Sequence, residues 1–168
     1  QYGWKTDNFI GPSPQQNALI TDWSKFWRQY RLSPQAKWAE STPHIATDIR
    51  TLLDALIDRA DEWIVDERPC LLHGDLWSGN VLCSASGEPV LIDPAAYLGH
   101  READLAMTTL FGGFPSRFYE AYQEVWPLEP EWKTRLEFYS VYHWLNHLNA
   151  FGTAYAPQCI QTLRSLLR

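Results

Sequence analysis

The sequence predicts a mostly helical α+β domain that holds a small β element. Apolar side chains recur at steps of three and four along most of the chain, which is typical of helices with one buried face. Between Pro69 and Asp93 the pattern changes to short apolar runs separated by polar segments that contain glycine. The length of 168 residues fits one core. We therefore expect residues 1–168 to form a single domain.

The first third of the chain is expected to contain a loop and two helices. Residues 1–17 carry glycine and proline among polar residues without a sustained period, so they predict a loop-like start. The spacing of apolar residues predicts a helix over 19–31. A second helix is expected to follow the Ser41-Thr42-Pro43 cap and to continue to Trp63.

The rest of the chain predicts three strands and then four helices. The strands are expected at 70–72, 81–83 and 90–92, with the last two forming a hairpin. The helices are expected at 102–110, 116–125, 130–151 and 157–167, where Gly112-Gly113 and Pro127 end the first two.

Composition excludes several classes of protein. Fourteen Lys and Arg against twenty Asp and Glu give a formal charge of −6, which disfavours nucleic acid and anionic membranes as partners. No apolar run approaches the roughly 20 residues that cross a bilayer, and the first residues do not resemble a secretory signal. Three widely spaced cysteines without a CxxC pair suggest neither disulfides nor a zinc cluster. We therefore expect a cytoplasmic protein without a membrane or nucleic-acid partner.

The chemistry is predicted between His73 and Asp93. Asp75 and Asn80 lie on one loop with four residues between them, and a hairpin separates them from Asp93 at the end of a strand. This spacing is typical of phosphotransfer sites. Asn80 and Asp93 offer the oxygen ligands that Mg²⁺ prefers. Asp75 is suited to orient an acceptor hydroxyl and to take its proton late in the reaction.

Two other interpretations of this segment use the same residues. Asp, Asn, Gly and Ser dominate turns, so the loop could be an ordinary surface turn. A metal-dependent hydrolase could use His73, Asp75, Asp93 and His100, but that interpretation explains neither Asn80 nor the glycines of the loop.

The motifs resemble the catalytic half of aminoglycoside-phosphotransferase-like kinases, and more narrowly the fructosamine kinase (ketosamine 3-kinase) family. The segments that carry the resemblance span nearly the whole chain: Asp7–Gly11 with Pro14, Gln15 and Asn17, then Leu71–Val81, Ile92–Met107, Leu110–Phe114 and Trp144–Gly152. It implies the C-terminal lobe of a protein-kinase-like fold, with the small β-hairpin carrying the catalytic and metal loops. It also implies ATP-dependent phosphorylation of the third-carbon hydroxyl of a ketosamine, a protein deglycation repair reaction.

The resemblance also implies roles for individual residues. Asp75 matches the catalytic base, Asn80 and Asp93 match the magnesium ligands, and His73 matches a residue that supports the loop. Asp104 resembles a buried acid that accepts hydrogen bonds from the catalytic loop. A plain negative charge at a helix N-terminus explains Asp104 equally well.

Four further residues are predicted to bind the substrate. Trp77 lies inside the catalytic loop, where an indole is expected to stack on a sugar face or an aliphatic amine, or otherwise to pack into the core. His143, Asn146 and His147 place polar groups among apolar residues of one helix and are predicted to recognise sugar hydroxyls. They could instead be satisfied polar groups near the cleft. Zinc bound by His143 and His147 would lack a third ligand at a suitable spacing.

The chain also departs from the family pattern. It has only four lysines (Lys5, Lys25, Lys37 and Lys133), and it has neither a GxGxxG loop nor a strand lysine for the nucleotide phosphates. We therefore expect the nucleotide lobe to be absent and turnover by this chain alone to be low. A non-catalytic sugar-amine binding or regulatory fragment is the alternative function. The expected partner is a free or protein-bound ketosamine, and the surface without its lobe is expected to favour self-association.

Overall fold

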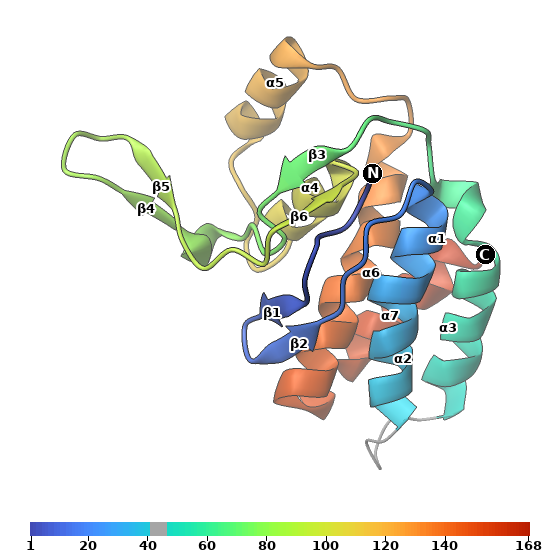
Figure 1. Ribbon diagram of the computed structural model, residues 1–168. Helices are drawn as coiled ribbons and strands as arrows, with labels where there is room; N and C mark the ends of the chain where they lie inside the picture. Colours follow the sequence, from blue (N-terminus) through green and yellow to red (C-terminus); the bar gives the residue numbers. More distant parts are fainter. Residues whose placement is uncertain (41–46) are drawn as a thin grey trace.

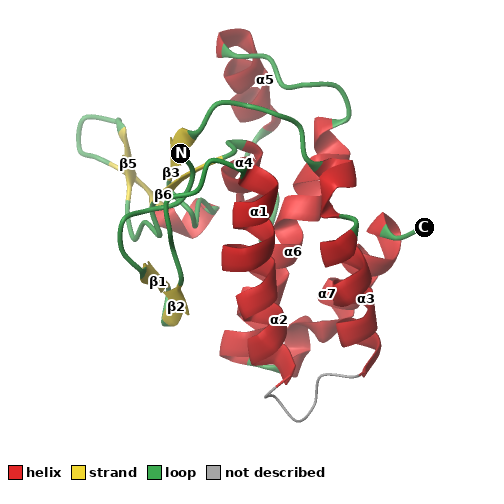
Figure 2. Ribbon diagram, turned by 45° about the vertical axis from the view of Figure 1, so that its right-hand side comes forward, coloured by secondary structure: helices red, strands yellow, loops and turns green. Residues whose placement is uncertain are grey.

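The computed structural model describes residues 1–40 and 47–168, and it shows a helical bundle with small sheets on one side. The helices are α1 (Trp23–Trp27), α2 (Ser33–Glu40), α3 (Thr47–Asp58), α4 (Glu102–Thr108), α5 (Ser116–Val125), α6 (Trp132–Phe151) and α7 (Ala156–Leu166). The strands are β1 (Asn8–Ile10), β2 (Ser13–Gln15), β3 (Cys70–Leu72), β4 (Val81–Cys83), β5 (Pro89–Leu91) and β6 (Tyr97–Gly99). α6 runs through the bundle of α1, α2, α3 and α7 (Figure 1), and the strands gather on one side of it (Figure 2).

Three antiparallel two-stranded sheets form in the described residues: β1 with β2, β3 with β6, and β4 with β5. The predicted hairpin of β4 and β5 and the predicted strand β3 are confirmed. The expectation that residues 1–17 form only a loop is wrong, and β6 was not expected. These strands have three residues each, so tertiary contacts rather than a long alternating pattern hold them in place.

The first helix continues further than the sequence predicts. A π-helical turn over Arg28–Leu32 joins α1 to α2, so helical structure extends to Glu40. Pro34 lies in the first turn of α2, and it does not end the helix. The predicted Ser41-Thr42-Pro43 cap lies outside the described residues.

The later helices are confirmed, with small shifts at their ends. α3 ends at Asp58, and a 3₁₀ turn over Ala60–Trp63 follows it where a continuous helix was expected. α4 ends at Thr108 because Phe111 and the two glycines after it adopt positive φ. α5 has the expected bounds, and both ends of α6 and of α7 lie within two residues of the predicted positions.

Large rings form much of the core. Trp23, Trp27 and Tyr139 are almost fully buried and contact one another, and the indole N–H of Trp23 donates to the Tyr139 hydroxyl at 2.9 Å. Trp23, Trp27 and Trp63 therefore serve packing, whereas the other tryptophans keep some exposed surface.

Two buried ion pairs fix the N-terminal end of α4. Arg135 of α6 forms a bidentate pair with Glu102 at 2.7 Å, and Arg101 pairs with Glu67 at 2.9 Å. Because paired arginine and carboxylate groups constrain each other's geometry, α4 has a fixed position against α6.

None of the described helices is long and apolar enough to cross a membrane.

Candidate active site

The N-terminal turn of α4 holds the catalytic loop through Asp104. The backbone amides of His73 and Gly74 each donate to one oxygen of this carboxylate at 2.7 Å. Burial raises the pKa of Asp104 to about 6, although both hydrogen bonds lower it. Asp104 therefore contacts the catalytic loop directly, as the resemblance implies, and its effect on catalysis stays a prediction.

Gly74 allows the loop to approach the segment that carries Asp93 (residues 92–96) closely. Its φ is +83°, and an added Cβ would lie 2.2 Å from the carbonyl oxygen of Ala95. At the same point the amide of Ala95 donates to the carbonyl of His73 at 2.8 Å. A side chain at position 74 would therefore separate the two segments.

His73 connects the loop to the strand end beside it. Its Nε2 lies 2.9 Å from the carbonyl oxygen of Ile92, and the amide of Asp75 donates to its Nδ1 at 3.3 Å. Because a carbonyl can only accept, these contacts require the proton on Nε2. His73 therefore supports both Asp75 and the segment that carries Asp93.

Asp75 and Asn80 contact each other inside the loop. The Asn80 amide nitrogen donates to the backbone carbonyl of Asp75 at 2.8 Å and to its Oδ2 at 3.2 Å. Burial raises the pKa of Asp75, and its electrostatic interaction with His147 opposes this effect. No described residue donates to Asn80 Oδ1 or Asp75 Oδ1, so one oxygen of each side chain is available to a ligand.

Asp93 completes a group of three oxygen-bearing side chains. It is exposed with φ of +51°, and its neighbour Ile92 donates its amide to the Asn80 carbonyl at 3.0 Å. The negative charge of Asp93 contributes to the raised pKa of Asp75, as expected for nearby carboxylates. Asn80 and Asp93 fit Mg²⁺, which is usually held by one or two protein oxygens together with water and phosphates.

A polar relay formed by Asn8, Gln15 and Tyr142 supports the segment that carries Asp93, and the sequence analysis missed it. Asn8 donates to the carbonyl of Ala96 at 2.9 Å, and Gln15 donates to the carbonyl of Ala95 at 3.0 Å. The Tyr142 hydroxyl donates to Gln15 Oε1 at 2.8 Å. In the sequence, only the family resemblance, to which Asp7–Gly11 and Gln15 contribute, pointed to these residues. Residues 1–17 show no sustained hydrophobic period, so their pattern assigns no role to the polar side chains.

Aromatic side chains line one side of the catalytic loop. The ring of Phe111 lies 6.0 Å from Trp77, 5.5 Å from Trp144 and 4.7 Å from His147, measured between centroids. Trp77 is half-buried and also covers Gly79, where an added Cβ would lie 2.3 Å from the indole. Trp77 therefore packs on protein and keeps some exposed surface, and its contact with a substrate stays a prediction. Phe111 was missed, although it lies in the LFGGF segment of the resemblance.

The three polar residues predicted on α6 separate into two environments. His143 and Asn146 are 2% and 4% exposed, and Asn146 accepts a hydrogen bond from Gln35 at 3.1 Å. Burial lowers the pKa of His143 to about 3, so this side chain is neutral. Only His147 is half-buried beside Phe111. Substrate contact stays a prediction for all three, and these positions favour His147.

The alternative metal sites gain no support. Among the described residues no group of three or more His, Cys, Asp and Glu side chains is placed to hold a metal ion. His147 Nδ1 lies 2.8 Å from the backbone carbonyl of His143, a contact within the helix. His100 is fully buried against Trp23 and Tyr139. The proposed hydrolase cluster therefore does not form among these residues.

Comparisons with known proteins give a consistent result. The model of the fructosamine kinase family matches residues 1–168. The chain is 44% identical over 172 residues to a probable ketoamine kinase of Synechocystis, covering 100% of this chain and 56% of that protein. It is 38% identical over 170 residues to the chloroplastic protein-ribulosamine 3-kinase of Arabidopsis thaliana, covering 99% of this chain and 51% of the relative.

Solved structures show the same similarity. A crystal structure from Thermobifida fusca, provisionally named a fructosamine-3-kinase, superimposes with a TM-score of 0.93 at 38% identity and covers 99% of this chain and 58% of that one. A Haemophilus somnus structure with the same provisional name gives 0.86 at 27% identity, covering 99% and 57%. The chain thus spans about half the length of the relatives that it matches.

Proposed function

Since the chain belongs to the fructosamine kinase family, we propose that it carries the catalytic loop of an ATP-dependent kinase that phosphorylates a sugar hydroxyl of ketosamines. The resemblance found in the sequence is thereby confirmed at the level of the family. Its relatives are named ketoamine kinases and ribulosamine 3-kinases, which are phosphotransferases. The proposal includes deglycation repair of fructosamines and ribulosamines. It also assigns the chain to the C-terminal lobe of a protein-kinase-like fold.

The observation that carries the proposal is the grouping of Asp75, Asn80 and Asp93. Asn80 fixes one carboxylate oxygen of Asp75 and leaves the other available. The amides of Ile92 and Ala95, on either side of Asp93, bond to the catalytic loop. The arrangement thus provides one proton acceptor beside two oxygen ligands, which phosphoryl transfer requires.

Asp75 is the proposed catalytic base. Its free Oδ1 would accept a hydrogen bond from the acceptor hydroxyl and orient the oxygen toward the γ-phosphorus of ATP. As the new P–O bond forms and the bond to ADP breaks, the hydroxyl proton passes to this carboxylate. The raised pKa of Asp75 makes it a better proton acceptor late in transfer.

Asn80 Oδ1 and the Asp93 carboxylate are the proposed Mg²⁺ ligands. The ion, when bound, supplies charge neutralisation for the phosphates of ATP. His73 and Asp104 act on the loop rather than on the reactants, because both bond to the backbone that carries Asp75. They are positioning residues in this proposal.

Trp77 and His147 are the proposed sugar-amine contacts. Both lie against Phe111 beside the catalytic loop, where an indole face and an imidazole edge could meet a sugar and its amine. His143 and Asn146 would act indirectly, because their buried side chains hold α6 in place.

The reaction can be tested directly. The chain is incubated with Mg-ATP and fructosyl-lysine, and phosphosugar formation is followed by ³¹P NMR. We expect product from the unmodified chain, at a low rate, and none from Asp75→Asn. Asp58→Asn, which changes an exposed carboxylate on α3, serves as the matched control. Equal rates with Asp75→Asn would remove this residue from the mechanism, and tight binding without product would favour a non-catalytic binding fragment.

Self-association and a cytoplasmic location also remain proposals. Large apolar side chains are exposed on the strands, among them Phe9 at 64% and Leu71 at 67%. Such side chains favour association when they form a continuous patch. Sedimentation velocity that shows only monomer at high concentration would contradict the expected association.

A further inference from the structure

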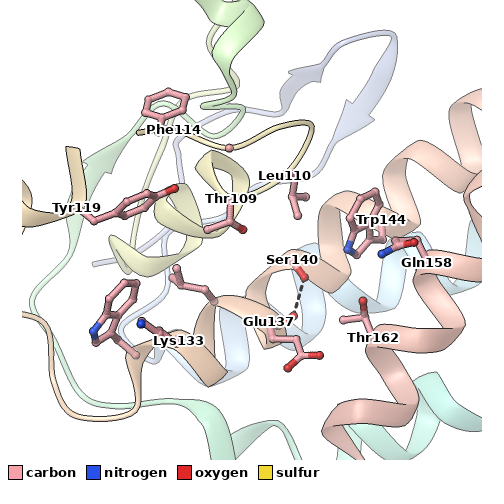
Figure 3. Close-up of a pocket in the computed structure, with 13 residues that line it drawn as sticks. Thr109, Leu110, Phe114, Tyr119, Lys133, Glu137, Ser140, Trp144, Gln158 and Thr162 are labelled. Atoms are coloured by element: carbon pink, nitrogen blue, oxygen red, sulfur yellow. Dashed lines mark hydrogen bonds between the residues drawn. The ribbon is translucent and has the colours of Figure 1, made fainter. Parts of the chain in front are cut away.

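Two faces of α6 contact different parts of the molecule. One lines a pocket of about 560 Å³ with residues that include Glu137 and Trp144 (Figure 3). Residues two positions apart on a helix point to nearly opposite sides, and Tyr142, on the side away from Trp144, donates to Gln15 of the relay. The guanidinium carbon of Arg31 lies 5.8 Å from the centre of the Tyr142 ring. Arg31 therefore lies on the active-site side of α6, and the proposed mechanism gives it no role.

Arg31 is a fully buried charge without a carboxylate partner in the described part of the chain. It is 0% exposed, and no Asp or Glu among the described residues forms an ion pair with it. Within residues 1–40 and 47–168 its Nε also has no hydrogen-bond partner. Buried charges are usually paired, so this arrangement reduces stability. Such departures from packing rules, like the π-helical turn that carries Arg31, concentrate at functional sites.

A chain of hydrogen bonds leads from Arg31 to the candidate active site. Its Nη2 donates to Asn17 Oδ1 at 2.9 Å, and the Asn17 amide donates to Asn8 Oδ1 at 3.0 Å. Asn8 then donates to the carbonyl of Ala96 at 2.9 Å. The other terminal nitrogen of Arg31, Nη1, donates to the carbonyl of Gln16 at 2.7 Å. The planar fork of the guanidinium thus binds two adjacent residues of one loop, and that loop holds the end of the segment that carries the proposed metal ligand.

Arg31 also contacts the next residue after this segment directly. Its guanidinium carbon lies 4.0 Å from the centre of the Tyr97 ring, a distance at which a cation and an aromatic ring attract each other. Burial raises the pKa of Tyr97, the charge of Arg31 opposes this effect, and Asp104 adds to it. Arg31 is therefore joined to two consecutive residues, Ala96 and Tyr97, by two separate contacts.

We propose that Arg31 is a positioning residue for phosphotransfer: its guanidinium joins the turn between α1 and α2 to residues 96 and 97, and thereby holds Asp93 beside Asp75 and Asn80. The inference rests on the proposed function. The action of Arg31 is indirect, because the buried guanidinium has no exposed surface for a substrate.

Amide hydrogen exchange, followed by NMR, tests this role without requiring turnover. The amides of Ile92 and Ala95 donate to carbonyls of the catalytic loop at 3.0 and 2.8 Å. Their exchange therefore reports how firmly the segment that carries Asp93 is held against that loop. Arg31→Met removes both contacts of the guanidinium. Asn17→Ala removes the hydrogen-bonded chain and keeps the contact of Arg31 with the Tyr97 ring.

Leu163→Ala is the matched control for a loss of global stability. Leu163 is fully buried on α7, next to Thr162, which lines the pocket of Figure 3. The cavity in this variant should destabilise the whole fold and leave the hydrogen bonds of Arg31 intact. Exchange of the Leu145 amide, in the buried part of α6, measures the global loss in every variant.

We expect Arg31→Met to accelerate exchange at Ile92 and Ala95 at least about tenfold, the effect of a lost hydrogen bond to a charged group. Asn17→Ala should accelerate it about three- to tenfold, and it decides the question if Arg31→Met does not fold. Leu163→Ala should leave both amides unchanged. If Arg31→Met and Asn17→Ala accelerate exchange only at Leu145, or act on Ile92 and Ala95 no more than Leu163→Ala does, Arg31 supports only the fold and the inference is overturned.

Steady-state kinetics of the same variants link this position to catalysis. Per folded molecule, kcat should fall in Arg31→Met and Asn17→Ala with KM unchanged, and both constants should stay unchanged in Leu163→Ala. If exchange changes as expected but kcat does not, the inference is overturned while the proposed function stands. If the unmodified chain forms no product, the proposed function fails, and the role of Arg31 in phosphotransfer fails with it.

Discussion

The side-chain amide of Asn80 donates to two oxygens of Asp75, the backbone carbonyl at 2.8 Å and Oδ2 at 3.2 Å. Because its nitrogen makes both contacts, a rotated amide would place an oxygen against two acceptors. The orientation of Asn80 is thereby fixed, and its Oδ1 stays available for a cation. One neutral side chain thus orients the proposed base and offers a metal ligand.

Replacement of this amide by a carboxylate should destabilise the fold. In Asn80→Asp an oxygen would face the carbonyl and carboxylate of Asp75, and we expect a loss of about 2–3 kcal/mol in the free energy of unfolding at pH 7.5. The loss should shrink at pH 5, where a protonated acid can donate. Urea unfolding at both pH values measures it. Asn80→Ala lacks the repulsion, so a similar pH dependence in that variant would contradict the explanation.

The close approach at Gly74 can be separated from its backbone conformation. Gly74 and Gly87 have nearly the same φ, +83° and +86°, but only at Gly74 would a Cβ meet a neighbour, Ala95. We expect Gly87→Ala to cost about 1 kcal/mol through backbone strain alone. Gly74→Ala should cost at least about 2 kcal/mol more, because the two segments must separate. Chemical denaturation compares them, and equal losses would show that the contact is unimportant.

Buried histidines should make the protein sensitive to acid. Burial lowers the pKa of both His100 and His143 to about 3. In the unfolded chain they titrate near 6.5, so it binds more protons than the native state between about pH 6.5 and 3. Their contribution to stability is present above pH 6.5 and is lost as the pH falls. We expect each histidine to lower the free energy of unfolding by about 2 kcal/mol between pH 6.5 and 4.5, which urea unfolding measures.

Two variants should change this loss of stability on acidification in opposite directions. His143→Gln should reduce the decrease. Asp104 acts in the opposite direction, because its pKa is raised to about 6, so its contribution is present below about pH 4 and is lost as the pH rises to 6. Asp104→Asn should therefore make the loss on acidification steeper. A profile unchanged in both variants would show that neither group controls the acid response.

The relay beneath Asp93 should affect activity more than binding. Burial raises the pKa of Tyr142 to about 12, so its hydroxyl is a donor to Gln15 at neutral pH. Tyr142→Phe should cost about 1 kcal/mol in stability. It should lower kcat of the proposed phosphotransfer with little change in KM. The reason is that the segment carrying Asp93 loses a hydrogen bond that supports it, whereas no contact with the substrate is removed. Steady-state kinetics measure this.

The control for this relay is Tyr30→Phe. The Tyr30 hydroxyl has no hydrogen-bond partner in the described part of the chain, so removing it should change neither stability nor kcat. If Tyr142→Phe raised KM and left kcat unchanged, the relay would have to act on substrate binding instead.

Several features could be predicted from the sequence because they depend on near neighbours. α5 and α6 follow from helical periodicity, and the hairpin of β4 and β5 follows from two apolar runs around a glycine-containing turn. The grouping of Asp75 with Asn80 follows from one short loop. These patterns are complete within a few residues of chain, so the sequence shows them directly.

Tertiary structure decided the rest, because the contacts join residues far apart in the chain. Tyr142 and Gln15 are separated by 127 positions, and Gln15 and Ala95 by 80, so no local pattern could assign the relay or the short strands β1 and β2. Folding likewise buried His143 and Asn146 and left His147 beside Phe111, although all three share one helix. A side chain's chemistry is set by its residue type, whereas the neighbours that shift its pKa or satisfy its hydrogen bonds exist only once distant segments have packed together.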